Sequence, residues 1–86
     1  ITQKPVVERI AEALLIMKEK FGFASDGKTL DAVLTRREIG DLAGVTTETT
    51  IRTLSQLNKD GAIRLHGKRI DVENVSDLVR LANVLD

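Results

Sequence analysis

The sequence predicts a mainly α-helical domain with a small β component, a winged helix-turn-helix. Residues 35–60 have the pattern of two short helices around the turn Gly44-Val45-Thr46. Residues 62–73 alternate apolar and polar side chains on both sides of His66-Gly67-Lys68, which is typical of a β-hairpin. Amphipathic helical patterns flank these segments, so we expect a helix pair and a wing enclosed by two further helices.

Length and composition predict a single domain, residues 1–86. The 86 residues include 42% hydrophobic side chains, which is enough for one compact core. The chain has no Cys and a single His, His66, so a thiol nucleophile and a Cys-based metal site are excluded and acid-base chemistry has little support. We therefore expect neither enzyme activity nor a cofactor in this domain.

No apolar run approaches the roughly 20 residues that a membrane-spanning helix needs, and the N-terminus lacks a signal-peptide pattern. We expect a cytoplasmic protein that does not bind membranes. The sequence lacks an initiating Met and starts just before a helical pattern, so we also expect a piece of a longer protein, without its sensory partner domain.

The charge is balanced overall but unevenly distributed. The chain has 13 basic and 13 acidic residues, which argues against a strongly basic nucleic-acid binder. Residues 35–69, however, contain seven basic and four acidic side chains, a net charge of +3, and the remainder carries −3. Positive charge is thus concentrated on the helix pair and the wing, where a phosphate backbone would lie, although chance variation on a mixed surface would also produce this difference.

The first helix is predicted at residues 5–21. Pro5 suits the first turn of a helix, and apolar residues then recur at alternating spacings of three and four: Val7, Ile10, Leu14, Met17 and Phe21. Gly22 ends the helix and Asp26-Gly27 favours a turn. The short apolar segment 30–34 predicts one small strand.

The helix pair has start and stop signals of its own. Thr35 and Glu38 have the spacing of a capping box, in which each side chain bonds the backbone N–H of the other residue. Gly40 permits a close approach of a neighbouring helix, and Gly44 supplies the left-handed residue that ends the first helix.

The second helix of the pair, predicted at 47–60, starts after Thr46, whose side chain can cap it, and ends at Asp60-Gly61. After the wing, Asn74 can cap a last helix at 75–85.

Glu48 and Arg52 are four residues apart, so they project from one face of the second helix. In a major groove a carboxylate can accept from the cytosine amino group, and a guanidinium can bond O6 and N7 of guanine. The alternative is a surface ion pair that stabilises the helix by roughly 0.2–0.5 kcal/mol. The first reading predicts a DNA half-site that contains a G·C pair.

Hydroxyl and basic side chains around this helix are candidates for phosphate contacts. Four Thr residues crowd its start although Thr is a mediocre helix former, and we select Thr46 and Thr49 as phosphate ligands. Three basic residues would fix the position of the domain along the DNA through phosphate contacts that do not depend on base sequence: Arg36 at the first helix, and Lys68 and Arg69 at the wing. Each of these basic residues could equally be an ordinary solvated surface charge.

Together these segments resemble the C-terminal DNA-binding domain of the Crp/Fnr family of bacterial transcription regulators, over nearly the whole chain. The resemblance is carried by Leu34-Thr35-Arg36-Arg37-Glu38-Ile39-Gly40, Thr46-Thr47-Glu48-Thr49-Thr50-Ile51-Arg52, Leu65-His66-Gly67-Lys68 and Ile70-Asp71-Val72-Glu73-Asn74.

The resemblance implies a role for each matched position. Glu48 and Arg52 match the base-reading residues of the family, whereas Arg36, Thr46, Thr49 and Lys68 match positions that hold phosphates. It also implies a homodimer on an inverted-repeat operator of double-stranded DNA. A sensor domain of the cyclic-nucleotide-binding type and a long dimer helix would precede this chain.

The sequence departs from the family pattern at several positions. Thr47 stands where one branch has an additional DNA-contacting Arg, and Ile51 occupies a groove-facing position where it could press on a thymine methyl. We count both as base contacts. Thr50 and Thr53 fall at usual core positions, so their hydroxyls need partners such as the carbonyls of the preceding turn. Asp26-Gly27 lies where some members touch RNA polymerase.

Two other functions stay open at this point. A winged helix can serve as a protein-protein interaction module, because the fold does not dictate the function. Such a module would bind its partner without Glu48 and Arg52. An enzyme is the weakest alternative, because no nucleophile is paired with a base, and turnover that depended on His66 would be needed to support it.

Overall fold

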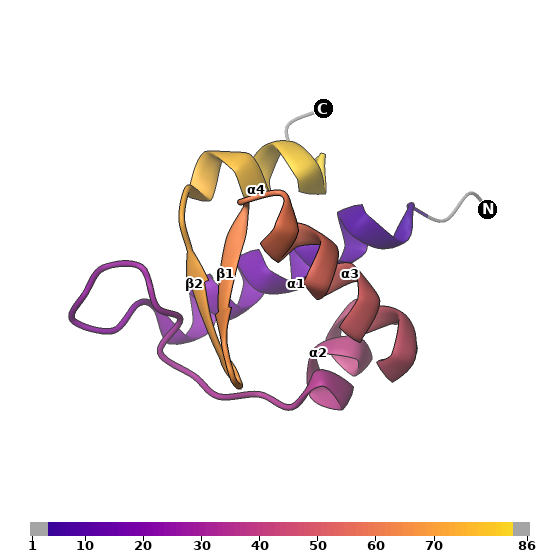
Figure 1. Cartoon of the computed structure of the whole chain (residues 1–86), viewed down its shortest axis with the longest axis horizontal. Helices are drawn as coiled ribbons and strands as arrows, with labels where there is room; N and C mark the ends of the chain where they lie inside the picture. The colour runs from indigo at the N-terminus through magenta and orange to yellow at the C-terminus, as the bar shows by residue number, and fades with distance from the viewer. Residues whose placement is uncertain (1–3, 84–86) are drawn as a thin grey trace.

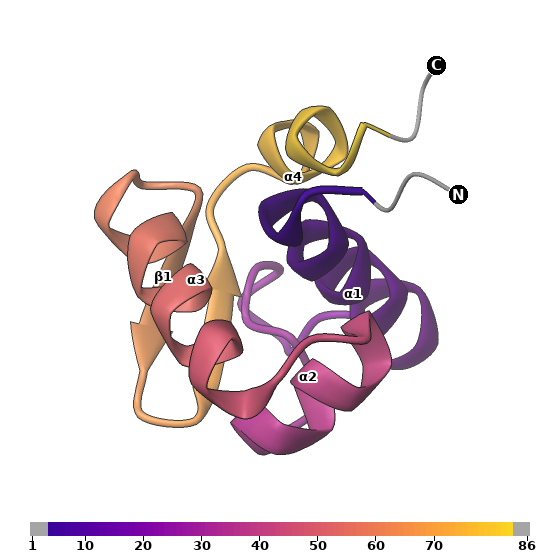
Figure 2. The ribbon, with the colours of Figure 1, turned by 90° about the vertical axis from the view of Figure 1, so that its right-hand side faces the viewer.

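The helix α1 (Val6–Phe21) forms the centre of the molecule, with α4 (Val75–Ala82) and α2 (Arg36–Ala43) on either side of it (Figure 1, Figure 2). The computed structural model describes residues 4–83. Across that range the remaining elements are α3 (Thr47–Lys59) and the strands β1 (Ile63–His66) and β2 (Arg69–Val72). The predicted class, mainly α with a winged helix-turn-helix arrangement, is confirmed.

The core is apolar and draws on every element except the exposed loops. Its fully buried side chains lie on the inner faces of the helices and the hairpin, with one more in the segment between α1 and α2, Leu30. The others include Ile10, Leu14, Met17, Ile39, Leu54, Leu57, Ile63, Ile70 and Leu78. Burial of apolar surface is the main driving force for folding, so this cluster holds the four helices and the hairpin in one unit.

The capping signals of the sequence are present. The N–H of Glu38 donates to the Thr35 hydroxyl at 3.0 Å, and the N–H of Thr35 donates to the Glu38 carboxylate at 2.8 Å. Gly44 ends α2 in the left-handed conformation, with φ 71°. Thr46 then caps α3 by accepting from the N–H of Thr49 at 3.3 Å. Local hydrogen bonds therefore define both ends of the turn.

The two strands form an antiparallel hairpin in which Ile63 faces Val72 and His66 faces Arg69. The connecting turn is Gly67-Lys68, so His66 belongs to β1 and not to the tip. Gly67 has φ 59°, and a positive φ at the first loop residue is typical of a type II′ hairpin turn. The wing is thus a tight hairpin with Lys68 at its tip.

The predicted strand at 30–34 is wrong. Contacts to β2 occur slightly earlier: the N–H of Leu30 donates to the Ile70 carbonyl and that of Val72 to the Lys28 carbonyl. Only isolated bridges form, among them one between Thr29 and Asp71. The chain after Leu30 must leave the sheet edge to reach α2, and Val33 is accordingly exposed.

The ends of three helices also differ from the prediction; α3 ends at Lys59, one residue early, with Asp60 as its C-cap residue. Pro5 precedes α1 as its N-cap residue, and the helix starts at Val6. The last helix ends at Ala82, because Asn83 adopts the left-handed conformation with φ 56° and its N–H bonds the carbonyls of Val79 and Arg80. The predicted extension to Leu85 lies partly outside the described residues. Among the helices described, none has the length and apolar character needed to cross a bilayer.

Candidate nucleic-acid interface

The helix α3 has two distinct faces. Thr50, Leu54 and Leu57 are buried in the core, whereas Glu48 and Arg52 are exposed on the outer surface. Ile51 lies with them and is 50% exposed, a large hydrophobic side chain without a packing role. Thr47, the first residue of α3, is exposed as well, so the structure leaves all four predicted base-contacting residues accessible on this helix.

Glu48 and Arg52 do not neutralise each other. Across residues 4–83, neither side chain takes part in an ion pair within 4 Å, and Arg52 instead donates to the hydroxyl of Thr49 at 3.3 Å. The surface ion pair considered as the alternative is thus not formed. Both charged groups stay available to a ligand.

The Thr residues at the start of α3 are used in two ways. Thr50 and Thr53 donate to the carbonyls of Thr46 and Thr49, each at 2.8 Å, so the predicted bonds to the preceding turn are present. Thr46 and Thr47 are exposed, and the hydroxyl of Thr46 donates to that of Thr49 at 3.0 Å. The exposed hydroxyls lie at the N-terminus of the helix, where backbone N–H groups favour anions.

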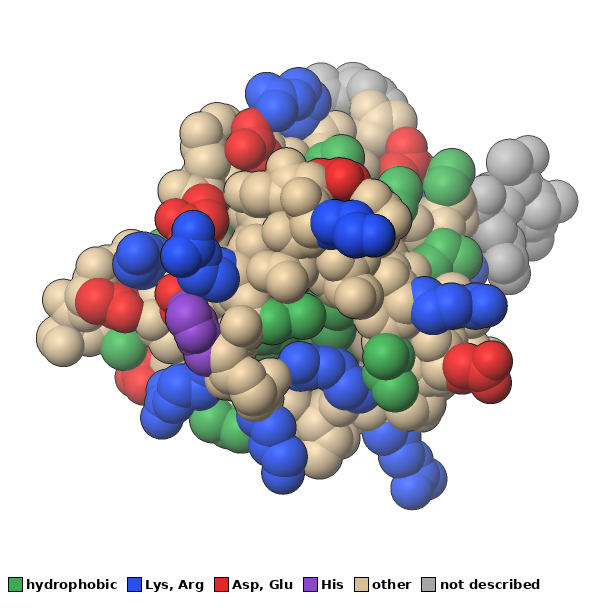
Figure 3. All heavy atoms as spheres, in the orientation of Figure 1, with side chains coloured by type: hydrophobic (Ala, Val, Ile, Leu, Met, Phe, Trp, Pro, Cys, Tyr) green, Lys and Arg blue, Asp and Glu red, His purple; other side chains and the backbone are tan. Residues whose placement is uncertain are grey.

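The wing places its basic residues beside the helix pair. Lys68 and Arg69 are exposed, and Figure 3 shows Lys and Arg side chains along the lower edge of this face, where the hairpin turn and α2 lie. The N–H and hydroxyl of Thr35 lower the pKa of Glu38, and the positive charge of Lys68 adds to this effect. Lys68 therefore lies close to the first turn of α2.

Arg36 is not a free surface cation. Its Nη2 donates to the carbonyl oxygen of Gly67 in the wing turn at 2.9 Å. Its Nη1 is buried and has no hydrogen-bond partner among the described residues. The predicted phosphate ligand is thus engaged with the wing in this structure.

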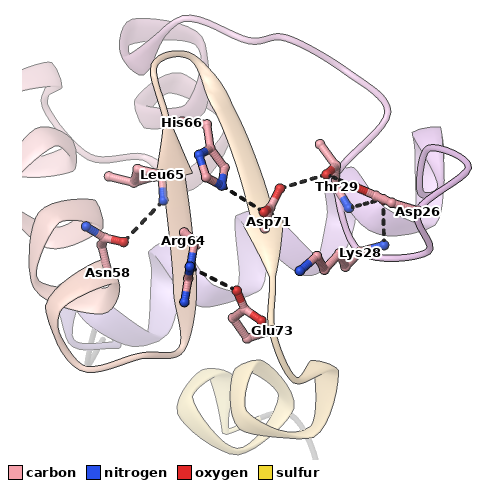
Figure 4. A network of polar contacts seen from close by, with 9 residues as sticks. All are labelled: Asp26, Lys28, Thr29, Asn58, Arg64, Leu65, His66, Asp71 and Glu73. Atoms are coloured by element: carbon pink, nitrogen blue, oxygen red, sulfur yellow. Dashed lines mark hydrogen bonds and ion pairs between the residues drawn. The ribbon is translucent and has the colours of Figure 1, made fainter.

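A polar network that the sequence analysis missed supports the wing from its other side (Figure 4). The buried carboxylate of Asp71 contacts Nε2 of His66 at 3.0 Å and accepts from the hydroxyl of Thr29 at 2.7 Å. The Thr29 hydroxyl also contacts Asp26, so its single proton is shared between the two carboxylates. The pKa of Asp26 is lowered to about 2, chiefly by the Thr29 hydroxyl and by the N–H groups of Lys28 and Thr29. The network ties the loop 24–29 to β2.

Two further missed residues hold the helix pair in place. Arg9 of α1 donates from Nε to the Ala43 carbonyl at 3.2 Å and also contacts the Gly44 carbonyl, at the negative end of α2. Asn58, near the end of α3, accepts from the N–H of Leu65 in β1 at 3.2 Å. Neither contact has a local sequence signal, because each partner lies in another element.

A helix pair joined by a three-residue turn, an outer helix with exposed charged side chains and an adjoining basic hairpin define a winged helix-turn-helix DNA-binding domain. The family model of the Crp-like helix-turn-helix domain matches residues 8–81. The chain belongs to this family, and it is a DNA-binding domain of the Crp/Fnr type.

Similar proteins support the same assignment. The chain is 38% identical over 84 residues to the transcriptional activator protein FnrL of Cereibacter sphaeroides, an alignment that covers 92% of the chain and 33% of that protein. The solved structure of FixK2 from Bradyrhizobium japonicum is 35% identical, with a TM-score of 0.78, and the match covers 92% of this chain and 39% of that one.

A CRP/FNR-family transcriptional regulator from Thermus thermophilus is 28% identical, with a TM-score of 0.81 over 95% of this chain and 42% of its own. The chain spans about a third of the length of the curated relatives it matches.

Proposed function

We propose that this domain reads an inverted-repeat operator with α3 in the major groove, as one half of a homodimeric transcription regulator. The observation that carries the proposal is the pair of exposed, unneutralised charges of Glu48 and Arg52 on the outer face of α3. A dimer would place two such helices in successive major grooves about 34 Å apart.

In this proposal four residues read base edges. The Glu48 carboxylate accepts from a cytosine amino group and the Arg52 guanidinium bonds O6 and N7 of guanine. Ile51 lies between them on the same surface and buries its exposed side chain against a thymine methyl. Thr47 at the first position of α3 offers its hydroxyl to a neighbouring base.

Phosphate contacts fix the register of the helix. Thr46 and Thr49 present hydroxyls beside the N-terminus of α3, where the helix dipole favours an anion. Lys68 and Arg69 reach the backbone from the wing, and Arg36 lies beside them at the start of α2. These contacts supply affinity without sequence preference.

The proposal includes the longer protein. A sensor domain would precede this chain, the regulator would act in the cytoplasm, and the exposed loop at Asp26-Gly27 would be available to RNA polymerase. This loop lies on a different part of the molecule from α3, so both contacts could be made at once (Figure 1).

The test is selection of binding sites from random double-stranded DNA by the dimeric protein, followed by binding measurements with point variants. We expect an inverted repeat. Arg52→Ala should reduce the free energy of DNA binding by roughly 1–3 kcal/mol and relax selection at one base pair. Lys68→Ala should weaken binding to all DNA sequences alike and reduce the salt dependence of binding. Arg80→Ala, an exposed Arg on α4, is the matched control and should leave binding unchanged.

Two results would contradict this function. One is the absence of a common sequence among the selected sites. The other is selection of the same DNA sequence when both Glu48 and Arg52 are replaced. Binding of a protein partner that persists in this double variant would favour a protein-interaction module.

A further inference from the structure

Arg36 links the start of α2 to the wing by a side-chain hydrogen bond. Arg36 is the first residue of α2, and its Nη2 spans to the Gly67 carbonyl in the turn between β1 and β2. The hairpin packs on α3 through β1, while α2 packs on α1 and α3. The Arg36 side chain therefore joins two elements that are otherwise positioned separately.

The second guanidinium nitrogen indicates that this arrangement is specific. Nη1 of Arg36 is buried and lacks an acceptor among residues 4–83. A buried donor without a partner is unfavourable, so a freely mobile arginine would turn this nitrogen to water. The bond from Nη2 to the Gly67 carbonyl holds the guanidinium at the wing turn in spite of this cost.

A hydrogen bond to the Gly67 carbonyl can determine the direction of the next residue, Lys68. A peptide unit is planar, so the carbonyl of Gly67 and the N–H of Lys68 form one rigid group. Gly67 itself has φ 59° and no side chain to restrict it, which makes the turn intrinsically permissive. A hydrogen bond to this carbonyl restricts the direction in which Lys68 leaves the turn.

We propose that Arg36 is a positioning residue for DNA binding: through the Gly67 carbonyl it fixes the wing turn so that Lys68 meets the phosphate backbone. This rests on the proposed function, because Lys68 is a phosphate ligand only if the domain binds DNA. It differs from the role expected for Arg36 from the sequence, a direct and independent phosphate contact.

A double-mutant cycle on the selected operator tests the coupling. If Arg36 acts through Lys68, Lys68→Ala has little further effect on DNA affinity once Arg36→Ala is present. The fold loss in affinity of the double variant is then about tenfold smaller than the product of the two single fold losses. Arg37→Ala is the matched control: Arg37 is exposed, adjacent and of equal charge, so its effect should multiply with that of Lys68→Ala. The inference would be overturned if the fold losses in DNA affinity from Arg36→Ala and Lys68→Ala multiply in the same way as those from Arg37→Ala and Lys68→Ala.

The second measurement needs no DNA. Nuclear magnetic relaxation of the backbone amides of Gly67, Lys68 and Arg69 reports the order of the turn on the ps–ns timescale. Arg36→Ala should lower the order of these amides and Arg37→Ala should not, with urea unfolding used to verify that both variants are folded.

Unchanged order in Arg36→Ala would overturn the inference even if the domain binds DNA. Failure of the wild-type protein to select a DNA sequence would instead contradict the proposed function, and the relaxation data would still decide whether Arg36 orders the turn.

Discussion

Replacement of Gly40 by Ala tests how closely α2 approaches the turn and α3. A Cβ added at Gly40 would lie 2.6 Å from the carbonyl oxygen of Val45 and 2.8 Å from the hydroxyl of Thr50. Carbon atoms do not normally approach other atoms so closely, so the surrounding structure must shift. Gly40 has ordinary helical geometry, which means that the effect is one of space and not of backbone strain.

Neither neighbour can move without loss. The N–H of Val45 donates to the Gly40 carbonyl at 2.8 Å, and the Thr50 hydroxyl donates to the Thr46 carbonyl, also at 2.8 Å. Overpacking typically costs 1–3 kcal/mol, and two simultaneous clashes favour the upper part of that range. Against this, Ala gains about 1 kcal/mol over Gly in helix propensity. We expect a net loss of roughly 1–2 kcal/mol in the free energy of unfolding.

Thermal unfolding followed by circular dichroism measures the effect. For a domain of this size the expected loss lowers Tm by about 5–15 °C. Asp41→Ala is the matched control, because Asp41 is the next residue of α2 and is exposed, and it should leave Tm unchanged or slightly raised. A Gly40→Ala variant that melts at or above the wild-type temperature would refute the reasoning, since helix propensity would then outweigh the clash.

Two further substitutions test the local hydrogen bonds. Thr35→Ala removes the hydroxyl that accepts from the Glu38 N–H and keeps the backbone N–H that donates to the Glu38 carboxylate. It should lower the free energy of unfolding by about 1 kcal/mol in urea titrations. Thr47→Ala, at an exposed Thr without a capping bond, should change it by less than about 0.5 kcal/mol, and equal effects of the two substitutions would contradict the cap. The pKa of Asp26 lies at about 2, below its ordinary 3.8, so its ionised form stabilises the fold above about pH 4 and this contribution is lost as the pH falls towards 2. Wild type should therefore exceed Asp26→Asn in stability at pH 5 and approach it near pH 2, and an Asp26 carboxyl signal that titrates near 3.8 would show the prediction to be wrong.

Features determined by near neighbours in the chain could be predicted from the sequence. The capping box of Thr35 and Glu38 and the left-handed Gly44 depend on contacts within a few residues, so their signals are local. The hydroxyls of Thr50 and Thr53 also find their acceptors one helical turn away. The helix pair was for this reason predictable almost residue by residue.

Features that depend on distant segments could not be predicted. Strict alternation along β2 places Asp71 opposite to Ile70 and Val72, on a face that would be open to water. The loop 24–29 covers that face, and Asp71 is buried against Thr29 as a result. The bond from Arg36 to Gly67 crosses 31 positions of the chain. In each case the sequence shows the polar residue but not the segment that packs against it.

The two faces of α3 separate the residues that we propose to read DNA from those that keep the domain folded. Leu54 and Leu57 are buried and hold the helix in the core, while Glu48, Ile51 and Arg52 are exposed and add little to it. Exposed substitutions usually change stability by less than about 0.5 kcal/mol. Variants at these three positions can therefore accumulate without unfolding the domain, and, under the proposed function, relatives built on this scaffold would diverge in operator sequence while the fold is retained.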